Sequence, residues 1–234
     1  MFRTVLAVLT FSVLASASTI TYTTPTGSVN GNLQPVSATT TITTGSGTIG
    51  VTLTDLTAST LDAGQLLSDL FFTLSTAPTT VLNGTTTPTS APLIDIAANG
   101  SVTTNTGAIA SWGLTSSGAT IHLDSLAGGA TQTIIGPGPY TASNGSIDGN
   151  PGHNPFINQT ATFSFAVSGV TANTTVTAAS FSWGTAGSTD TVTGVCTAGV
   201  GPSCNSSTVP EPITSGLVGT GLMALFFLRR RVRG

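Results

Sequence analysis

The chain has 234 residues, of which 6% are charged, and its formal net charge is −3 at pH 7. Its five basic residues all lie outside residues 18–208: Arg3 stands near the start, and Arg229, Arg230, Arg231 and Arg233 stand together near the end. Because residues 18–208 hold seven Asp and no Lys or Arg, they lack the charge that neutralises phosphates, which excludes nucleic acid as a partner and disfavours anionic lipid surfaces.

The first seventeen residues are typical of a secretory signal peptide. Arg3 supplies the positive charge, residues 4–14 form the apolar run, and Ala15 and Ala17 put small side chains where signal peptidase cuts. We expect cleavage after Ala17. The run is shorter than the roughly 20 residues that span a bilayer, so an uncleaved anchor is the weaker alternative. Signal peptidase is therefore an expected partner, and the body is expected to be exported.

Residues 18–208 are predicted to form one all-β body, a β-sandwich or a jelly-roll-like domain. Ser and Thr make up nearly a third of the chain, and Thr is its commonest residue. β-branched residues favour extended backbone, and hydroxyl groups can solvate a surface with few charges. Two small sandwiches joined by a linker over residues 79–92 are the alternative. Alternating patterns predict strands over residues 19–24, 38–44, 48–54, 70–75, 108–114, 120–123, 161–168 and 174–183, with 62–70 as the candidate helix.

The last two predicted strands show which side chains alternation assigns to the core. In the first of them, Phe163 and Phe165 fall on one face, as in a half-buried antiparallel strand. In the second, Phe181 and Trp183 fall on the face that we expect in the core, and Val176 falls on the opposite face.

Residues 136–155 form the longest segment without a strand pattern, and Gly, Pro or Asn stands at nearly every second position. Long loops of this kind are often functional. Tyr140, Asp148 and His153 in this segment are the candidate ligand contacts. A loop that only wraps the end of the sandwich is the plainer interpretation.

No catalytic, cofactor or metal site is predicted. His122 and Asp124 fall on one face of a strand, and Asp148 with His153 could complete a cluster, but the spacing matches neither a zinc motif nor a calcium loop. Residues 18–208 hold no Glu, their seven Asp mark no glycosidase pair, and no G-x-S-x-G occurs. We expect a protein that is not an enzyme.

Cys196 and Cys204 are the only two cysteines, and seven residues separate them. In an exported protein, an even pair in a Gly-rich loop indicates one disulfide. A loop this short contributes about 2–3 kcal/mol to stability. We expect the bridge to hold the last strand in place just before the C-terminal segment.

Residues 209–234 are predicted to be a membrane tail. Residues 213–228 are uncharged, and the Arg cluster follows at once, so we expect a single transmembrane helix with its Arg end in the cytoplasm. Sixteen residues span about 24 Å, and snorkelling arginines or local thinning bridge the rest of a bilayer core of roughly 30 Å. A buried core helix is the alternative. Before the run, Val209-Pro210-Glu211-Pro212 is kept extended by its two prolines.

This order of Val209-Pro210-Glu211-Pro212, apolar run and Arg cluster resembles the sorting tail of bacterial PEP-CTERM proteins. The resemblance covers about the last 26 residues. It implies recognition at Pro210-Glu211-Pro212 by a membrane-embedded exosortase and removal of the tail near that point. It also implies association with extracellular polymer and surface layers, as for other anchor signals whose hydrophobic tail is lost.

The resulting expectation is an exported structural or matrix protein of the cell envelope. It would be tethered to the cytoplasmic membrane by the C-terminal helix before processing, and would be extracellular or at the surface afterwards. The alternative is a carbohydrate-binding or adhesive module that contacts extracellular polysaccharide. Its candidate stacking residues are Trp112, Trp183 and Tyr140, of which Trp183 is expected to be structural.

Overall fold

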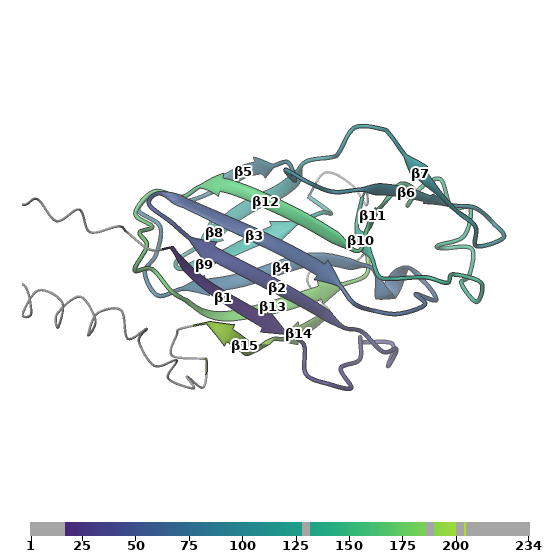
Figure 1. The fold of residues 1–234 in the computed structure, drawn as a ribbon, viewed down its shortest axis with the longest axis horizontal. Coiled ribbons are helices and arrows are strands. Elements are labelled where there is room, and N and C mark those ends of the chain that lie inside the picture. Colours follow the sequence, from purple (N-terminus) through teal and green to yellow (C-terminus); the bar gives the residue numbers. More distant parts are fainter. Residues whose placement is uncertain (1–16, 128–131, 186–189, 200–203, 205–234) are drawn as a thin grey trace, which may run out of the picture. The chain divides into compact units, whose positions relative to one another are not determined.

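The computed structural model describes residues 17–127, 132–185, 190–199 and 204 (Figure 1). The predicted sorting tail, with its processing motif, transmembrane helix and Arg cluster, lies outside the described residues, and so does the predicted signal peptide apart from Ala17. Within the described part of the chain, no helix is long and apolar enough to cross a membrane.

The described residues form two β-sheets and one turn of 3₁₀ helix, η1 (Ala63–Gln65). The first sheet is antiparallel, with its five strands in the order β12-β3-β2-β1-β15. The prediction of an all-β body is therefore confirmed. The strands of this sheet are β1 (Ser18–Thr23), β2 (Ala38–Thr44), β3 (Thr48–Asp55), β12 (Thr160–Ala166) and β15 (Val195–Gly199).

The second sheet branches at its central strand, β4 (Leu67–Leu74). On one side of β4 lie β9 (Thr120–Asp124), β8 (Trp112–Ser117) and β5 (Asn83–Thr86), and on the other side lie β13 (Val176–Trp183) and β14 (Thr191–Thr193). A smaller extension begins where Ile134 pairs with Leu67, at the start of β4. Its strands are β10 (Ile134–Ile135), β11 (Phe156–Asn158), β6 (Leu93–Ile96) and β7 (Val102–Asn105).

The main hydrophobic core draws its side chains from both sheets, as in a β-sandwich. Phe163 on β12 and Trp112 on β8 connect the two layers, because their ring centroids lie 5.2 Å apart. Phe163 and Phe165 are buried, as alternation predicts. Other core members are Ile20, Ile42, Val51 and Leu53 from the first sheet and Leu70, Phe72, Ile121 and Phe181 from the second.

Threonine side chains cover the outer face of the first sheet. Those of β1 and β2 lie opposite each other in pairs, and the two hydroxyl oxygens of each pair are 3.0–3.1 Å apart. The hydroxyl groups of each pair thus hydrogen-bond to one another, and this face of the sheet is polar although it carries no charge. The pairs are Thr19 with Thr43, Thr21 with Thr41, and Thr23 with Thr39.

Two local predictions are wrong, and the segment of the alternative linker contains a strand. Residues 62–70 form η1, capped by the Asp62 side chain, which accepts a hydrogen bond from the Gly64 N–H, and then enter β4. Residues 79–92, the linker of the two-sandwich alternative, contribute β5 to the second sheet. The strand predicted over 108–114 begins at Trp112 and continues to Ser117, as β8.

A β-bulge shifts the start of β13 relative to the alternation in its sequence. Val176 pairs with Leu74, and Ala178 pairs with the adjacent Thr73, so one extra residue stands on β13. Val176 is therefore buried in the core, where alternation placed it on the outer face. Beyond the bulge, Phe181 and Trp183 are buried as predicted.

Candidate functional site

Three side chains that can bind a metal ion meet on the outer face of the second sheet. Asp69 on β4 lies directly opposite Asp124 on β9, and His122 stands two residues before Asp124 on the same face. One ligand atom from each of the three lies within 4.8 Å of the other two. We call Asp69, His122 and Asp124 the acid–histidine cluster. Their residue types could hold a divalent cation.

The ring of His122 is fixed from two directions. Its Nε2 lies 2.8 Å from Oδ1 of Asp69, and its ring stacks on Phe71 with the centroids 3.9 Å apart and the planes 11° apart. The hydroxyl of Ser68 donates to the other oxygen of Asp69. The Asp69 side chain is 0% exposed and that of His122 is 21% exposed. The cluster therefore has one desolvated carboxylate inside and opens to solvent at His122.

The surroundings of Asp124 raise the pKa of its carboxyl group. Burial raises the pKa of Asp124, and the charge of Asp69 raises it further, while the Leu126 N–H and the neighbouring His122 lower it. The Leu126 N–H donates to Oδ1 of Asp124 at 2.6 Å. Since like charges directly opposite on neighbouring strands repel, the pair favours a proton or a cation between its members.

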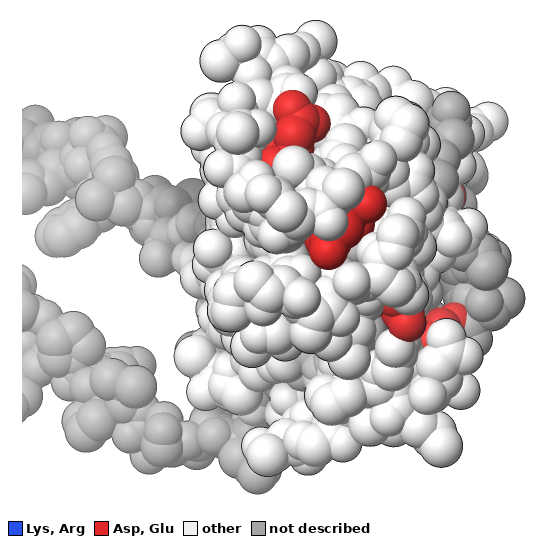
Figure 2. Space-filling model, turned by 90° about the vertical axis from the view of Figure 1, so that its right-hand side faces the viewer, with Lys and Arg blue, Asp and Glu red and all other residues white. Residues whose placement is uncertain are grey.

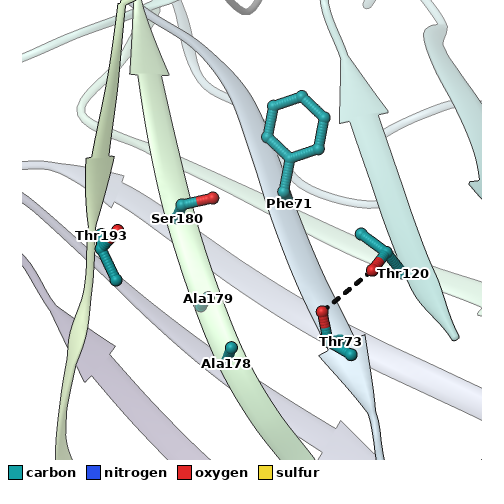
Figure 3. Close-up of a pocket in the computed structure, with 7 residues that line it drawn as sticks. All are labelled: Phe71, Thr73, Thr120, Ala178, Ala179, Ser180 and Thr193. Carbon is teal, nitrogen blue, oxygen red and sulfur yellow. Dashed lines mark hydrogen bonds between the residues drawn. The ribbon is translucent and has the colours of Figure 1, made fainter.

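A shallow hollow of about 320 Å³ lies beside Phe71 on the same sheet. Figure 3 shows that its lining comes from neighbouring strands, and that the hydroxyl groups of Thr73 and Thr120 are hydrogen-bonded, with 3.0 Å between the oxygens. The lining offers hydroxyl and apolar groups and carries no charged side chain. It consists of Phe71, Thr73, Thr120, Ala178, Ala179, Ser180 and Thr193.

The structure brings His122 and Asp124 together, but the third member of the cluster is Asp69 and not a residue of the 136–155 loop. In that loop, Nδ1 of His153 lies 2.6 Å from the carbonyl oxygen of Ser146. Sequence reasoning missed Asp69 because only the register of β4 against β9 places it opposite Asp124. The available signal was a single charged residue, Asp69, within a strand that is otherwise uncharged.

The 136–155 loop packs around a second, smaller core that includes Tyr140, Ile147 and Phe156. The Tyr140 hydroxyl donates to the carbonyl oxygen of Gly136 at 2.7 Å. Burial raises the pKa of Tyr140 to about 12, with a smaller contribution from the charge of Asp55. The ring of Tyr140 is therefore a structural group of the loop. Contact of Asp148 and His153, both half-buried, with a ligand stays a prediction.

The three aromatic side chains expected to stack on sugars in the carbohydrate-binding alternative are buried. Trp112, Trp183 and Tyr140 are 0%, 3% and 3% exposed, so none of them presents a ring face to solvent. Phe71, half-buried beside the hollow, is the aromatic side chain that the outer face of the second sheet offers instead.

A disulfide joins Cys196 and Cys204, whose Cα atoms lie 5.0 Å apart, so the predicted pairing is confirmed. Cys196 belongs to β15, which pairs with β1 at the edge of the first sheet. The bridge therefore closes the chain onto this edge at the last described residue, four positions before the sequence that a family model recognises.

That family model describes the PEP-CTERM protein-sorting motif, and it matches residues 208–231. The chain therefore carries a PEP-CTERM sorting motif in its last residues. The motif implies processing by an exosortase and export through the membrane to the cell surface or beyond. No curated protein and no solved structure matches the chain, so the body has to be understood from its own residues.

Proposed function

We propose that this PEP-CTERM protein is a structural or matrix protein of the cell envelope or the extracellular polymer layer. The observation that carries the proposal is the sorting motif at residues 208–231. A signal peptide over residues 1–17 takes the body across the cytoplasmic membrane, and a helix over residues 213–228 tethers it there. The exosortase then acts at Pro210-Glu211-Pro212, and the body leaves the membrane.

The surface of the body supports this role. Residues 18–208 contain no Lys or Arg, and on the face drawn in Figure 2 a few separate acidic groups stand in an uncharged surface. Threonine hydroxyl groups on the outer face of the first sheet can hydrogen-bond to neutral polymers. A surface of this kind tolerates a hydrated polysaccharide layer without attracting nucleic acid.

The proposal is tested by changing the processing motif in the producing cell. In one variant Pro210, Glu211 and Pro212 become Ala, and in the matched control Asn205, Ser206 and Ser207 become Ala. We expect wild type and control to reach the surface or the medium, while the motif variant accumulates in the membrane fraction with its tail attached. Equal release of all three would contradict the assignment of Pro210-Glu211-Pro212. Untrimmed protein in the cytosol would contradict export.

Carbohydrate binding or adhesion is a second candidate function, and the hollow beside Phe71 is the observation that favours it. A glycan array probed with the exported protein distinguishes a carbohydrate-binding module from a matrix protein. Affinity that is abolished by Phe71→Ala and kept by Leu33→Ala, a substitution at a side chain that is 80% exposed, would favour a binding module. No reproducible affinity would favour the matrix role.

A further inference from the structure

We propose that the acid–histidine cluster of Asp69, His122 and Asp124 is a Zn²⁺ site. The proposal concerns the body alone and is independent of how the tail is processed.

The geometry places three ligands around one point on a rigid part of the sheet. Asp69 and Asp124 are direct cross-strand partners on β4 and β9, and His122 shares their face. The ligand atoms lie within 4.8 Å of one another, and Nε2 of His122 is already 2.8 Å from Oδ1 of Asp69. Zinc binds its ligands at about 2.0–2.2 Å, so side-chain rotations that bring the three ligand atoms to within about 4.4 Å of one another complete the site.

The negative charge of the two carboxyl groups favours the binding of a cation from outside the chain. Two carboxyl groups face each other, and one of them, on Asp69, is fully buried. Residues 18–208 contain no Lys or Arg, so His122 is the one side chain near the pair that can carry positive charge. A single imidazolium cannot balance two carboxylates, whereas a divalent ion neutralises both and leaves His122 neutral as a ligand.

A buried hydroxyl group beside the cluster is a separate observation that points to a ligand. Ser182 on β13 is the cross-strand partner of Asp69 on the side away from Asp124. Its side chain is 0% exposed, and its Oγ has no hydrogen-bond partner among the residues that the structure describes. Buried polar groups are rarely left unpaired. An ion held by three side chains keeps a fourth position for water, and such a water can bond to the Ser182 hydroxyl.

The ligand types favour zinc over calcium and magnesium. Calcium and magnesium take oxygen ligands in sets of six or more, and a site with an imidazole and two carboxylates suits neither. Zinc binds imidazole nitrogen and carboxylate oxygen in four-coordinate sites, with water in the remaining position. Bound there, Zn²⁺ joins β4 to β9 in the middle of the second sheet, next to Phe71 and the hollow. Because the unfolded chain lacks this arrangement, the ion stabilises the folded protein.

The test titrates the exported protein, stripped with a chelator, with ZnCl₂ at neutral pH in a calorimeter. We expect one Zn²⁺ per chain and a rise in Tm when it binds. His122→Gln should weaken binding by more than the roughly 10–100-fold that loss of an outer-shell partner costs. Co²⁺ in place of Zn²⁺ should give the visible spectrum of a four-coordinate ion in the wild type and lose it in His122→Gln.

The matched control is His153→Gln, because the chain has two histidines and His153 lies in the 136–155 loop. This control should bind Zn²⁺ as the wild type does. Absence of uptake by the wild type, equal affinity in His122→Gln, or a loss caused by His153→Gln would overturn the proposal. A stoichiometric Ca²⁺ site that survives His122→Gln would overturn the choice of metal. If circular dichroism shows that His122→Gln has lost its strands, Asp124→Asn replaces it in the Zn²⁺ titration and is judged by the same criteria.

Discussion

Asp55 is predicted to make the body less stable as the pH rises. Its side chain is fully buried at the end of β3, where Oδ1 accepts from the Thr57 N–H at 2.8 Å. Oδ2 has no hydrogen-bond partner among the described residues. Burial raises the pKa of Asp55 from 3.8 to about 7, although the polar groups of Thr57 and the nearby backbone of Leu67 and Gly136 act in the opposite direction.

The magnitude follows from the two pKa values. Between pH 3.8 and about 7 the folded chain keeps a proton on Asp55 that the unfolded chain releases. Asp55 therefore lowers the free energy of unfolding as the pH rises through this window, and its contribution to stability is fully present only below pH 3.8. About three pH units at about 1.36 kcal/mol each give a loss of about 4 kcal/mol at most. The raised pKa of Asp124 acts in the same direction.

Urea denaturation of wild type and Asp55→Asn across this pH range measures the effect. Asn keeps an acceptor for the Thr57 N–H and cannot ionise, so its curve should lose the part of the pH dependence that Asp55 supplies. A constant offset between the two proteins is expected, because the amide replaces a carboxyl oxygen. If Asp55→Asn loses stability as steeply as the wild type, the fall has another source and the reasoning about Asp55 is wrong.

Three further variants test the packing of the body and its disulfide. Phe163→Ala removes a fully buried ring in contact with Trp112 and should lower the free energy of unfolding by about 3–5 kcal/mol, while Ser164→Ala on the exposed face of the same strand should change it by less than about 0.5 kcal/mol. Equal effects of the two would contradict the assignment of faces. Replacing Cys196 and Cys204 by Ser should cost about 2–3 kcal/mol and make stability insensitive to reducing agent. A wild type that reducing agent does not destabilise would contradict this role of the bridge.

Much of the fold could be predicted because the alternation of polar and apolar residues can be recognised within a single strand. The bounds predicted for β2 are those observed, and Phe163 and Phe165 face the core as predicted. In a half-buried strand successive side chains point to opposite faces, so the sequence of the strand alone shows which of them are buried. The branch strands β10 and β11 have two and three residues, which is too short to show any period. The position of Val176 depends on a bulge, and a bulge is a property of two paired strands.

The candidate site was predictable in part for the same reason. His122 and Asp124 stand two residues apart, so their shared face follows from one strand. Asp69 stands far away in the sequence and joins them through the pairing of β4 with β9. Tyr140 illustrates the opposite case: a loop rich in Gly and Pro gave no sign that Tyr140 packs on Ile147 and Phe156 in a core of its own.

The central claim is that the two end segments carry an anionic, hydroxyl-rich body across the cytoplasmic membrane. Mass spectrometry of the chain ends, in protein taken from the surface and extracellular fractions, tests it most directly. We expect a chain that begins at Ser18 and lacks Arg229 to Arg233. Protein found in the cytosol with Met1 and Arg233 both intact would contradict it.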